Sequence, residues 1–213
     1  MKYIILILTA ILTSIHSFGQ NELELYKVLY KTADSLIAIG EISSIDTTSI
    51  FAKAKNLDNK HPVEYFKVSS KYLEKFKFNE AAFFYFLGSM RYRYYNSANP
   101  KYKPGDDGAL YSSFKYVVGE PLKMFLQTDI DNMISIIRLA IYYYSGNDYD
   151  FFSKDKNKEK YNLQIKLYND LAQKFETQKE TYIEEWTKNR KEWEEQMDKM
   201  IEEKKHQSQK IGR

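Results

Sequence analysis

The stretch EAAFFYFLGSMRYRYY, residues 80–95, decides the fold of this chain. Residues 81–87 are apolar at every position, so a helix formed there has no polar side to turn toward water. Such a helix belongs inside a protein, and we expect it to be the central helix, starting at the N-cap residue Asn79 and ending at Tyr95. Gly88 weakens a helix, and its position predicts that a neighbouring element approaches closely there.

Further helices are expected on both sides of the central one, because apolar side chains recur with helical spacing. Asp107 is a candidate cap for one of them, and Thr128–Asp131 resembles a capping box that opens a second very apolar helix. The sequence therefore predicts an all-α bundle. The expected helices span residues 22–39, 50–55, 62–75, 108–118, 121–126 and 129–144.

A weak internal repeat has an offset of 49 residues. In both copies a short helix and a capped turn precede a long apolar helix that ends in tyrosines, as in helix hairpins of the tetratricopeptide type. The alternative explanation is the general aromatic richness of a chain with 19 Tyr and 13 Phe. The matching positions are Leu73, Phe76, Tyr94 and Tyr95 with Leu122, Phe125, Tyr143 and Tyr144.

One long charged helix is predicted after the core, over residues 156–205. No glycine or proline occurs between Gly146 and Gly212. A set of positions seven residues apart keeps one phase throughout, which favours one helix over two and also suits a partner helix. These positions are Ile165, Ala172, Lys179, Trp186, Trp193 and Met200.

The two tryptophans of the chain, Trp186 and Trp193, lie in this helix among many Glu and Lys residues. One interpretation is that both fold back onto the core of the protein. A second is that they form an exposed docking stripe for another chain, since tryptophan is favoured at interface hot spots. A third is a frayed, weakly ordered tail.

The first 19 residues have the layout of a secretory signal peptide. Lys2 precedes an apolar run, and the small residues Ser17 and Gly19 stand just before Gln20. The apolar run is shorter than the ~20 residues that span a bilayer. We therefore expect an exported protein, periplasmic or secreted, with a signal peptide at 1–19, a helical core domain at 20–155 and a disordered tail at 206–213.

The composition argues against two classes of partner for such a protein, nucleic acid and the membrane interior. The formal net charge is only +3, and acidic and basic residues are interleaved, which does not favour nucleic acid. No later segment contains 18 consecutive apolar residues, so no stable membrane insertion is expected after cleavage of the leader. The chain has no cysteine, so packing must hold the fold without disulfides.

No catalytic motif, cofactor motif or metal-ligand spacing is present. The histidines beyond the leader, His61 and His206, are isolated in the sequence. Paired carboxylates leave one enzymatic alternative, an exported hydrolase of glycan or cell-wall material. The competing explanation is that these acids cap helices and loops. The pairs are Asp106/Asp107, Asp129/Asp131 and Asp148/Asp150.

Arginine usage is more informative, because the chain has 27 Lys and only five Arg. Arg91, Arg93 and Arg138 lie among tyrosines in the two most apolar helices. A guanidinium can pair bidentately with a carboxylate or stack on an aromatic ring. The two interpretations are internal ion pairs and a cleft for an acidic ligand or partner. Such a cleft would include Tyr94, Tyr95 and Tyr142.

Residues 81–94, of the type A-x-F-x-x-x-x-G-x-x-R-x-R-Y, resemble a motif of uncharacterised exported bacterial helical proteins. A following stretch, ALYSSFKYVVGEP at 109–121, extends the resemblance. It covers about residues 62–145, carries no known activity, and implies that Gly88, Arg91, Arg93, Gly119 and Pro121 belong together.

From the sequence we expect an exported, non-enzymatic interaction protein whose partner is another protein. Its candidate binding residues are the Arg/Tyr group and the two tryptophans. The hydrolase is the first alternative, and a small-ligand binder with an aromatic pocket is the second.

Overall fold

The computed structural model describes residues 26–211, with side chains to Glu203. The predicted signal peptide and the last two residues of the predicted tail lie outside this range. The described part is all-α, as predicted, and contains no strand. A first helix spans residues 26–38. The other α-helices are α2 (Thr47–Lys55), α3 (Val63–Leu73), α4 (Phe78–Ala98), α5 (Ala109–Val117), α6 (Gly119–Leu126), α7 (Ile130–Gly146), α8 (Lys158–Thr177) and α9 (Lys179–Ile211).

Three short helical turns complete the fold: a π-helical turn at Pro104–Gly108 and 3-10 turns at Asp150–Phe152 and Lys154–Lys156. None of the helices within residues 26–211 is both long and apolar enough to cross a membrane.

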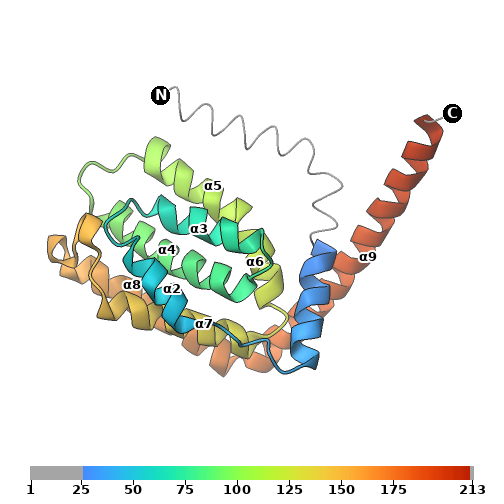
Figure 1. The fold of residues 1–213 in the computed structure, drawn as a ribbon, viewed down its shortest axis with the longest axis horizontal. Helices are drawn as coiled ribbons and strands as arrows, with labels where there is room; N and C mark the ends of the chain where they lie inside the picture. Colours follow the sequence, from blue (N-terminus) through green and yellow to red (C-terminus); the bar gives the residue numbers. More distant parts are fainter. Residues whose placement is uncertain (1–25, 212–213) are drawn as a thin grey trace.

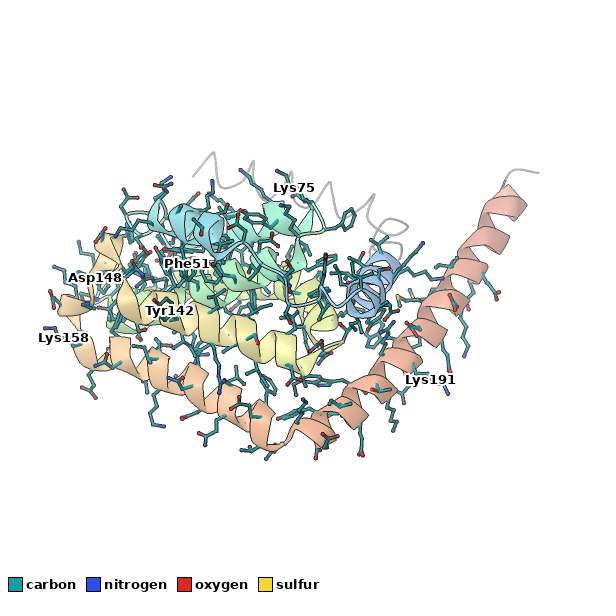
Figure 2. All side chains as sticks on the ribbon, turned by 60° about the horizontal axis from the view of Figure 1, so that its bottom comes forward. Phe51, Lys75, Tyr142, Asp148, Lys158 and Lys191 are labelled. Atoms are coloured by element: carbon teal, nitrogen blue, oxygen red, sulfur yellow. The ribbon has the colours of Figure 1, made fainter. Side chains whose placement is uncertain are left out.

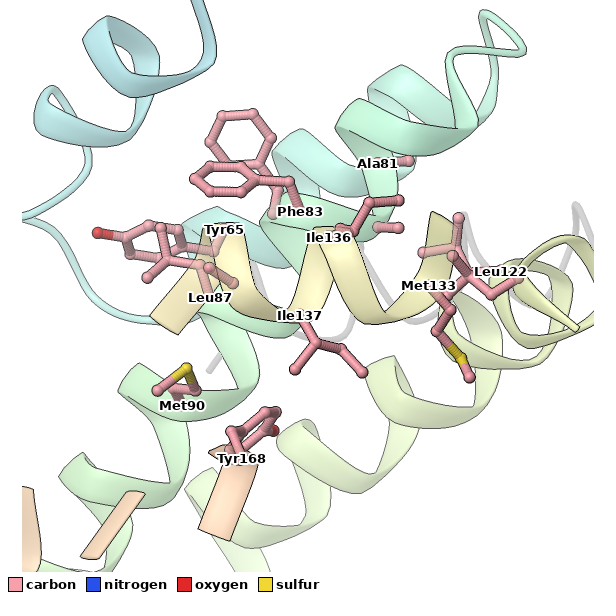
Figure 3. Packing of buried hydrophobic residues seen from close by; sticks show 14 of the residues in the cluster. Tyr65, Ala81, Phe83, Leu87, Met90, Leu122, Met133, Ile136, Ile137 and Tyr168 are labelled. Atoms are coloured by element: carbon pink, nitrogen blue, oxygen red, sulfur yellow. The ribbon is translucent and has the colours of Figure 1, made fainter. Parts of the chain in front are cut away.

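Helix α4 is the central helix, as its uniformly apolar sequence predicts. Helices α3, α6, α7 and α8 all pack against it (Figure 1). Figure 3 shows Phe83 and Leu87 of α4 among side chains of α3 and α7, with Tyr168 of α8 on another side. Because neighbours cover α4 all round, its apolar residues are buried without needing one preferred face.

Asn79 has a different role from the predicted N-cap. Helix α4 begins one residue earlier, at Phe78, and Asn79 is buried inside its first turn. Its amide group donates to the carbonyl oxygens of Ile42 at 2.5 Å and Ser44 at 3.1 Å. The side chain therefore ties the segment before α2 to the central helix. The partner carbonyls lie 37 and 35 residues away in the sequence, so the pattern around Asn79 could not predict these hydrogen bonds.

Gly88 marks the predicted close approach. A Cβ atom added there would lie 2.7 Å from the Cβ of Tyr65 on α3. A Cβ next to the backbone cannot rotate away, so α3 and α4 would have to separate. The hydrogen on Gly88 thus sets the distance between these two helices.

Replacing Gly88 with alanine is expected to lower the free energy of unfolding by about 1–3 kcal/mol through overpacking. This loss opposes the gain of about 1 kcal/mol that alanine brings to a helix interior. Gly146→Ala is the matched control, because a Cβ at Gly146 meets nothing within 4 Å. Urea denaturation of both variants measures the difference, and equal stabilities would contradict the close approach.

The two short–long helix pairs suggested by the internal repeat are present as α3–α4 and α6–α7. Asp129 caps α7, accepting a hydrogen bond from the Asn132 N–H at 2.8 Å. Phe76, in the turn between α3 and α4, has a φ of 56°. Each pair contributes a long helix to one shared core.

The single helix predicted over residues 156–205 is wrong, because the structure has two helices there. Gln178 leaves helical geometry, with φ −115° and ψ 25°, between α8 and α9. Figure 2 shows the change of direction between the two helices. It brings Trp186 against Phe175, with ring centroids 5.6 Å apart. Only Gln178 departs from helical geometry, and no residue is added or lost there. The apolar positions therefore stay seven residues apart across the bend, so their spacing in the sequence does not reveal it. Helix α9 also runs on to Ile211, through most of the predicted disordered tail.

The second half of α9 extends away from the bundle beside the first helix, residues 26–38 (Figures 1 and 2). The two helices run antiparallel, as two ion pairs show: Lys27 with Asp198 at 2.5 Å and Arg190 with Asp34 at 2.7 Å. Met197 is fully buried in a small apolar cluster with Tyr30. These contacts all fall on one side of α9.

Candidate functional site

Arg91 and Asp58 form an ion pair inside the protein. The guanidinium Nη2 lies 3.0 Å from Oδ1 of Asp58, and both side chains are fully buried. Asp58 lies in the turn that follows α2, whereas Arg91 lies in the second half of α4. Hydroxyls of Tyr65 and Tyr143 donate to the two oxygens of Asp58 at 2.7 and 2.8 Å. The carboxylate therefore has a partner for each oxygen.

Aromatic rings and backbone oxygens surround the guanidinium of Arg91. Its Nη1 donates to the Tyr161 hydroxyl at 2.9 Å, and Nη2 donates to the Asn147 carbonyl at 2.9 Å. Its Cζ lies 4.7 Å from the ring centroid of Tyr144 and 5.0 Å from that of Tyr149. Cation–π contacts of this kind strengthen when water is excluded.

Burial fixes the protonation states in this network. Desolvation is the main cause that raises the pKa values of the surrounding tyrosines, so their hydroxyls stay neutral. Burial opposes the charge of Arg91, but the tyrosines and Asp58 outweigh it and raise its pKa. The network joins α3, α4, α7, α8 and the segment between α7 and α8. It matches the predicted internal ion pair, and its buried atoms offer no surface to a ligand.

The other predicted residues of α4 separate from Arg91. Arg93 points to the exposed side, beside Tyr111, where it opposes the upward shift that burial gives the Tyr111 pKa. Tyr94 is buried, and its hydroxyl donates to the Ser153 carbonyl at 2.8 Å. Tyr95 is partly buried, with its ring 5.4 Å from that of Phe152. Consecutive positions on a helix point about 100° apart, so these side chains do not converge.

Arg138 and Tyr142 of α7 lie on the surface. Arg138 is 59% exposed and pairs with Glu176 of α8 at 2.7 Å. Tyr142 is 70% exposed and stacks on Phe51 of α2, with centroids 6.1 Å apart. The predicted cleft that unites the Arg/Tyr group is therefore absent from residues 26–203. Of the residues that the family resemblance groups, Gly119 lies against Tyr85, and Gly88 lies against Tyr65 and Phe66.

The paired carboxylates that could suggest a hydrolase make structural contacts instead. Asp129 caps α7, and Asp131 pairs with Lys179 at 2.6 Å. Asp148 accepts from its own loop, including the Lys154 N–H at 2.9 Å, and these hydrogen bonds outweigh burial and lower its pKa. Asp150 lies 3.7 Å from Lys55. These four acids thus serve caps, a loop and surface ion pairs.

Asp107 does not cap a helix, contrary to the prediction. It lies 3.1 Å from Nε2 of His61, inside a cluster with Tyr92, Tyr95 and Phe151. Nδ1 of His61 accepts from the Val63 N–H at 3.3 Å, so the ring is held as the neutral tautomer with its proton toward Asp107. Burial lowers the His61 pKa more than Asp107 raises it. This cluster was missed because 46 residues of sequence separate His61 from Asp107.

The two tryptophans have different environments. Trp186 is 7% exposed and belongs to the main core, whereas Trp193 is 50% exposed. Met200, seven residues further along α9, is 44% exposed. We define the distal stripe as Trp193, Gln196 and Met200, which lie on one side of the projecting half of α9 by their spacing. Among residues 190–203 of α9, the stripe holds the large apolar side chains that the first helix leaves exposed.

A groove of about 620 Å³ runs between the first helix and α9, on another side of α9 from the distal stripe. Five of its six charged lining side chains pair with one another, through Lys27 with Asp198 and through Arg190 with Asp34 and Glu194. The sixth is Lys31. Within the described residues, no group of three His, Asp or Glu side chains could hold a metal ion.

No protein-family model, curated protein or solved structure matches this chain.

Proposed function

We propose that this protein is exported and acts without catalysis, by docking another protein chain on the distal stripe of α9. The observation that carries the proposal is the half-exposed ring of Trp193 on a helix that projects from the bundle. Tryptophan is among the residues most enriched at binding hot spots. The fold does not need Trp193 to be exposed to solvent, whereas a docked partner would bury its ring.

The shape of the stripe favours a helix as the docked element. Trp193 and Met200 are seven residues apart, which is the repeat of one helix packed along another. Gln196 lies between them, so the surface is continuous over two helical turns. The first helix already packs on this part of α9. It contacts Arg190, Met197 and Asp198 and leaves the stripe open.

Export rests on the composition of residues 1–19, which matches a secretory leader. The remainder suits a compartment outside the cytoplasm, because an aromatic core stabilises it and no cysteine is available for unwanted disulfides. The compartment in this proposal is the periplasm or the extracellular space.

The hydrolase alternative has less support from the site. Catalysis by two acids needs both carboxyls across one substrate. Asp129, Asp131, Asp148 and Asp150 instead contact helix ends, a loop or lysines. The apolar stripe favours docking over this chemistry.

A photo-crosslinking amino acid at Gln196 tests the proposal in cells that export the protein. We expect a discrete crosslinked adduct from position 196 and none from Lys191, an exposed position on the opposite side of the same helix from the stripe. Trp193→Ala should abolish the adduct, because it removes the main apolar contact. No adduct at 196, or equal adducts at both positions, would overturn the proposal. Mass spectrometry of the adduct identifies the docked chain.

A further inference from the structure

We infer that the chain docked on the distal stripe is a second copy of this protein, with the two α9 helices antiparallel. This inference rests on the proposed docking function and names its partner. It follows from the distribution of charge along α9, the spacing of the stripe and the helix that already covers the other side of α9.

Charge along α9 is divided into two blocks. Residues 184–203 carry eight acidic and four basic side chains, a net charge of −4. Residues 204–211 carry three basic side chains and no acidic one. Two copies aligned in parallel would place like blocks together, which is unfavourable. Antiparallel copies place the basic end of each beside the acidic block of the other.

The stripe supplies a register for this pairing. Aligning Trp193 of one copy with Met200 of the other produces two equivalent apolar layers, since the same contact recurs on the opposite side of a two-fold axis. In this register position 204 falls opposite Asn189 of the second copy. By the 100° step of the helix, positions 185 and 204 lie on the side of α9 that carries the stripe, and position 204 then lies within about one helical turn of Glu185 of the second copy. The apolar register and the charge register therefore agree.

The first helix completes the assembly. It binds the Arg190 and Met197 side of α9, so a second copy meets a preformed two-helix unit rather than a lone helix. Two such units packed through their stripes make a four-helix arrangement, which buries apolar seams effectively. Preformed units also lose less conformational entropy on association than an isolated helix would.

The mass of the purified protein in solution tests the assembly, measured by light scattering and sedimentation over a range of concentrations. We expect a dimer that weakens in high salt, since exposed charges are screened. Trp193→Ala should raise the dimer dissociation constant by about 30-fold or more, the effect of losing a hot-spot side chain. Tyr116→Ala, at a more exposed aromatic of α5, is the control and should leave the dimer unchanged.

A charge swap tests the antiparallel register. The variant Lys204→Glu and the variant Glu185→Lys should each form a weaker dimer than the wild type, because like charges then meet at both ends. Mixing the two variants should restore a strong dimer containing one copy of each, since every contact again joins opposite charges. Circular dichroism of each variant confirms that it is folded.

The outcomes separate this inference from the proposed function. A wild-type protein that stays monomeric, or variants that fail to form a mixed dimer, overturns the second copy as partner. If the crosslinker at position 196 then captures a different protein, docking on the stripe stands and only the inference falls. A dimer that survives Trp193→Ala also overturns the inference, because the contact then lies elsewhere.

Discussion

Replacing Arg91 with methionine is expected to lower the free energy of unfolding by about 3–5 kcal/mol, because it leaves the carboxylate of Asp58 buried without its cation. The hydroxyls of Tyr65 and Tyr143 would remain hydrogen-bonded to that carboxylate, but neutral donors do not cancel a buried charge. The substitution also removes one of the two hydrogen bonds to the Asn147 carbonyl. Urea denaturation followed by circular dichroism measures the loss.

Two further variants show whether this loss comes from the buried charge. Arg138→Met removes a guanidinium from the surface pair with Glu176 and should cost no more than about 1 kcal/mol. Arg91→Met combined with Asp58→Asn removes both charges and should recover part of the stability. An Arg91 variant as stable as the Arg138 variant would contradict the structural role of the ion pair.

Replacing Trp186 with alanine is expected to cost about 3–5 kcal/mol, the usual effect of removing a large aromatic side chain from a core. Its ring packs against Phe175 and Tyr182, with centroid distances of 5.6 and 5.2 Å. The contact with Phe175 joins the start of α9 to the end of α8, and the contact with Tyr182 lies within α9. Removing them should therefore also free the projecting half of α9 from its fixed direction.

Trp193→Ala is the matched comparison, in the same helix and one heptad away. It should change the stability of the monomer by no more than about 0.5 kcal/mol, as for most surface substitutions. Because the chain has only two tryptophans, each variant leaves one fluorescent ring. The ring left in Trp193→Ala should emit at the shorter wavelength, because Trp186 is buried. Similar stability losses in the two variants would show that the two rings share one environment.

Elements whose signal is local in sequence were predictable. The uniformly apolar residues 81–87 identified α4 as the central helix, and the glycine inside it identified the close contact with Tyr65. The start of α7 was predicted to within one residue, but the predicted capping box over Thr128–Asp131 is not formed. Asp129 caps the helix instead, through a group only three residues away. In each case the interaction lies within the window in which the pattern was found.

Predictions failed where the same pattern of residues in the sequence is compatible with two different structures. Trp186 and Trp193 occupy equivalent heptad positions, yet the bend at Gln178 buries the first and leaves the second exposed. Arg91 and Arg138 both stand among tyrosines, yet one is in the core and the other on the surface. Asp58 was missed altogether, because its partner Arg91 is 33 residues away and a turn aspartate is ordinarily exposed.

The sequence by itself determined the all-α class, the central helix and the residue types able to form a buried ion pair or a docking stripe. These follow from periodicity and side-chain chemistry, which act between near neighbours. Tertiary structure alone decided which arginine meets a carboxylate, which tryptophan stays in water and where the long C-terminal segment bends. Each of those outcomes depends on contacts between distant segments, and packing around α4 selects among arrangements that local patterns allow equally.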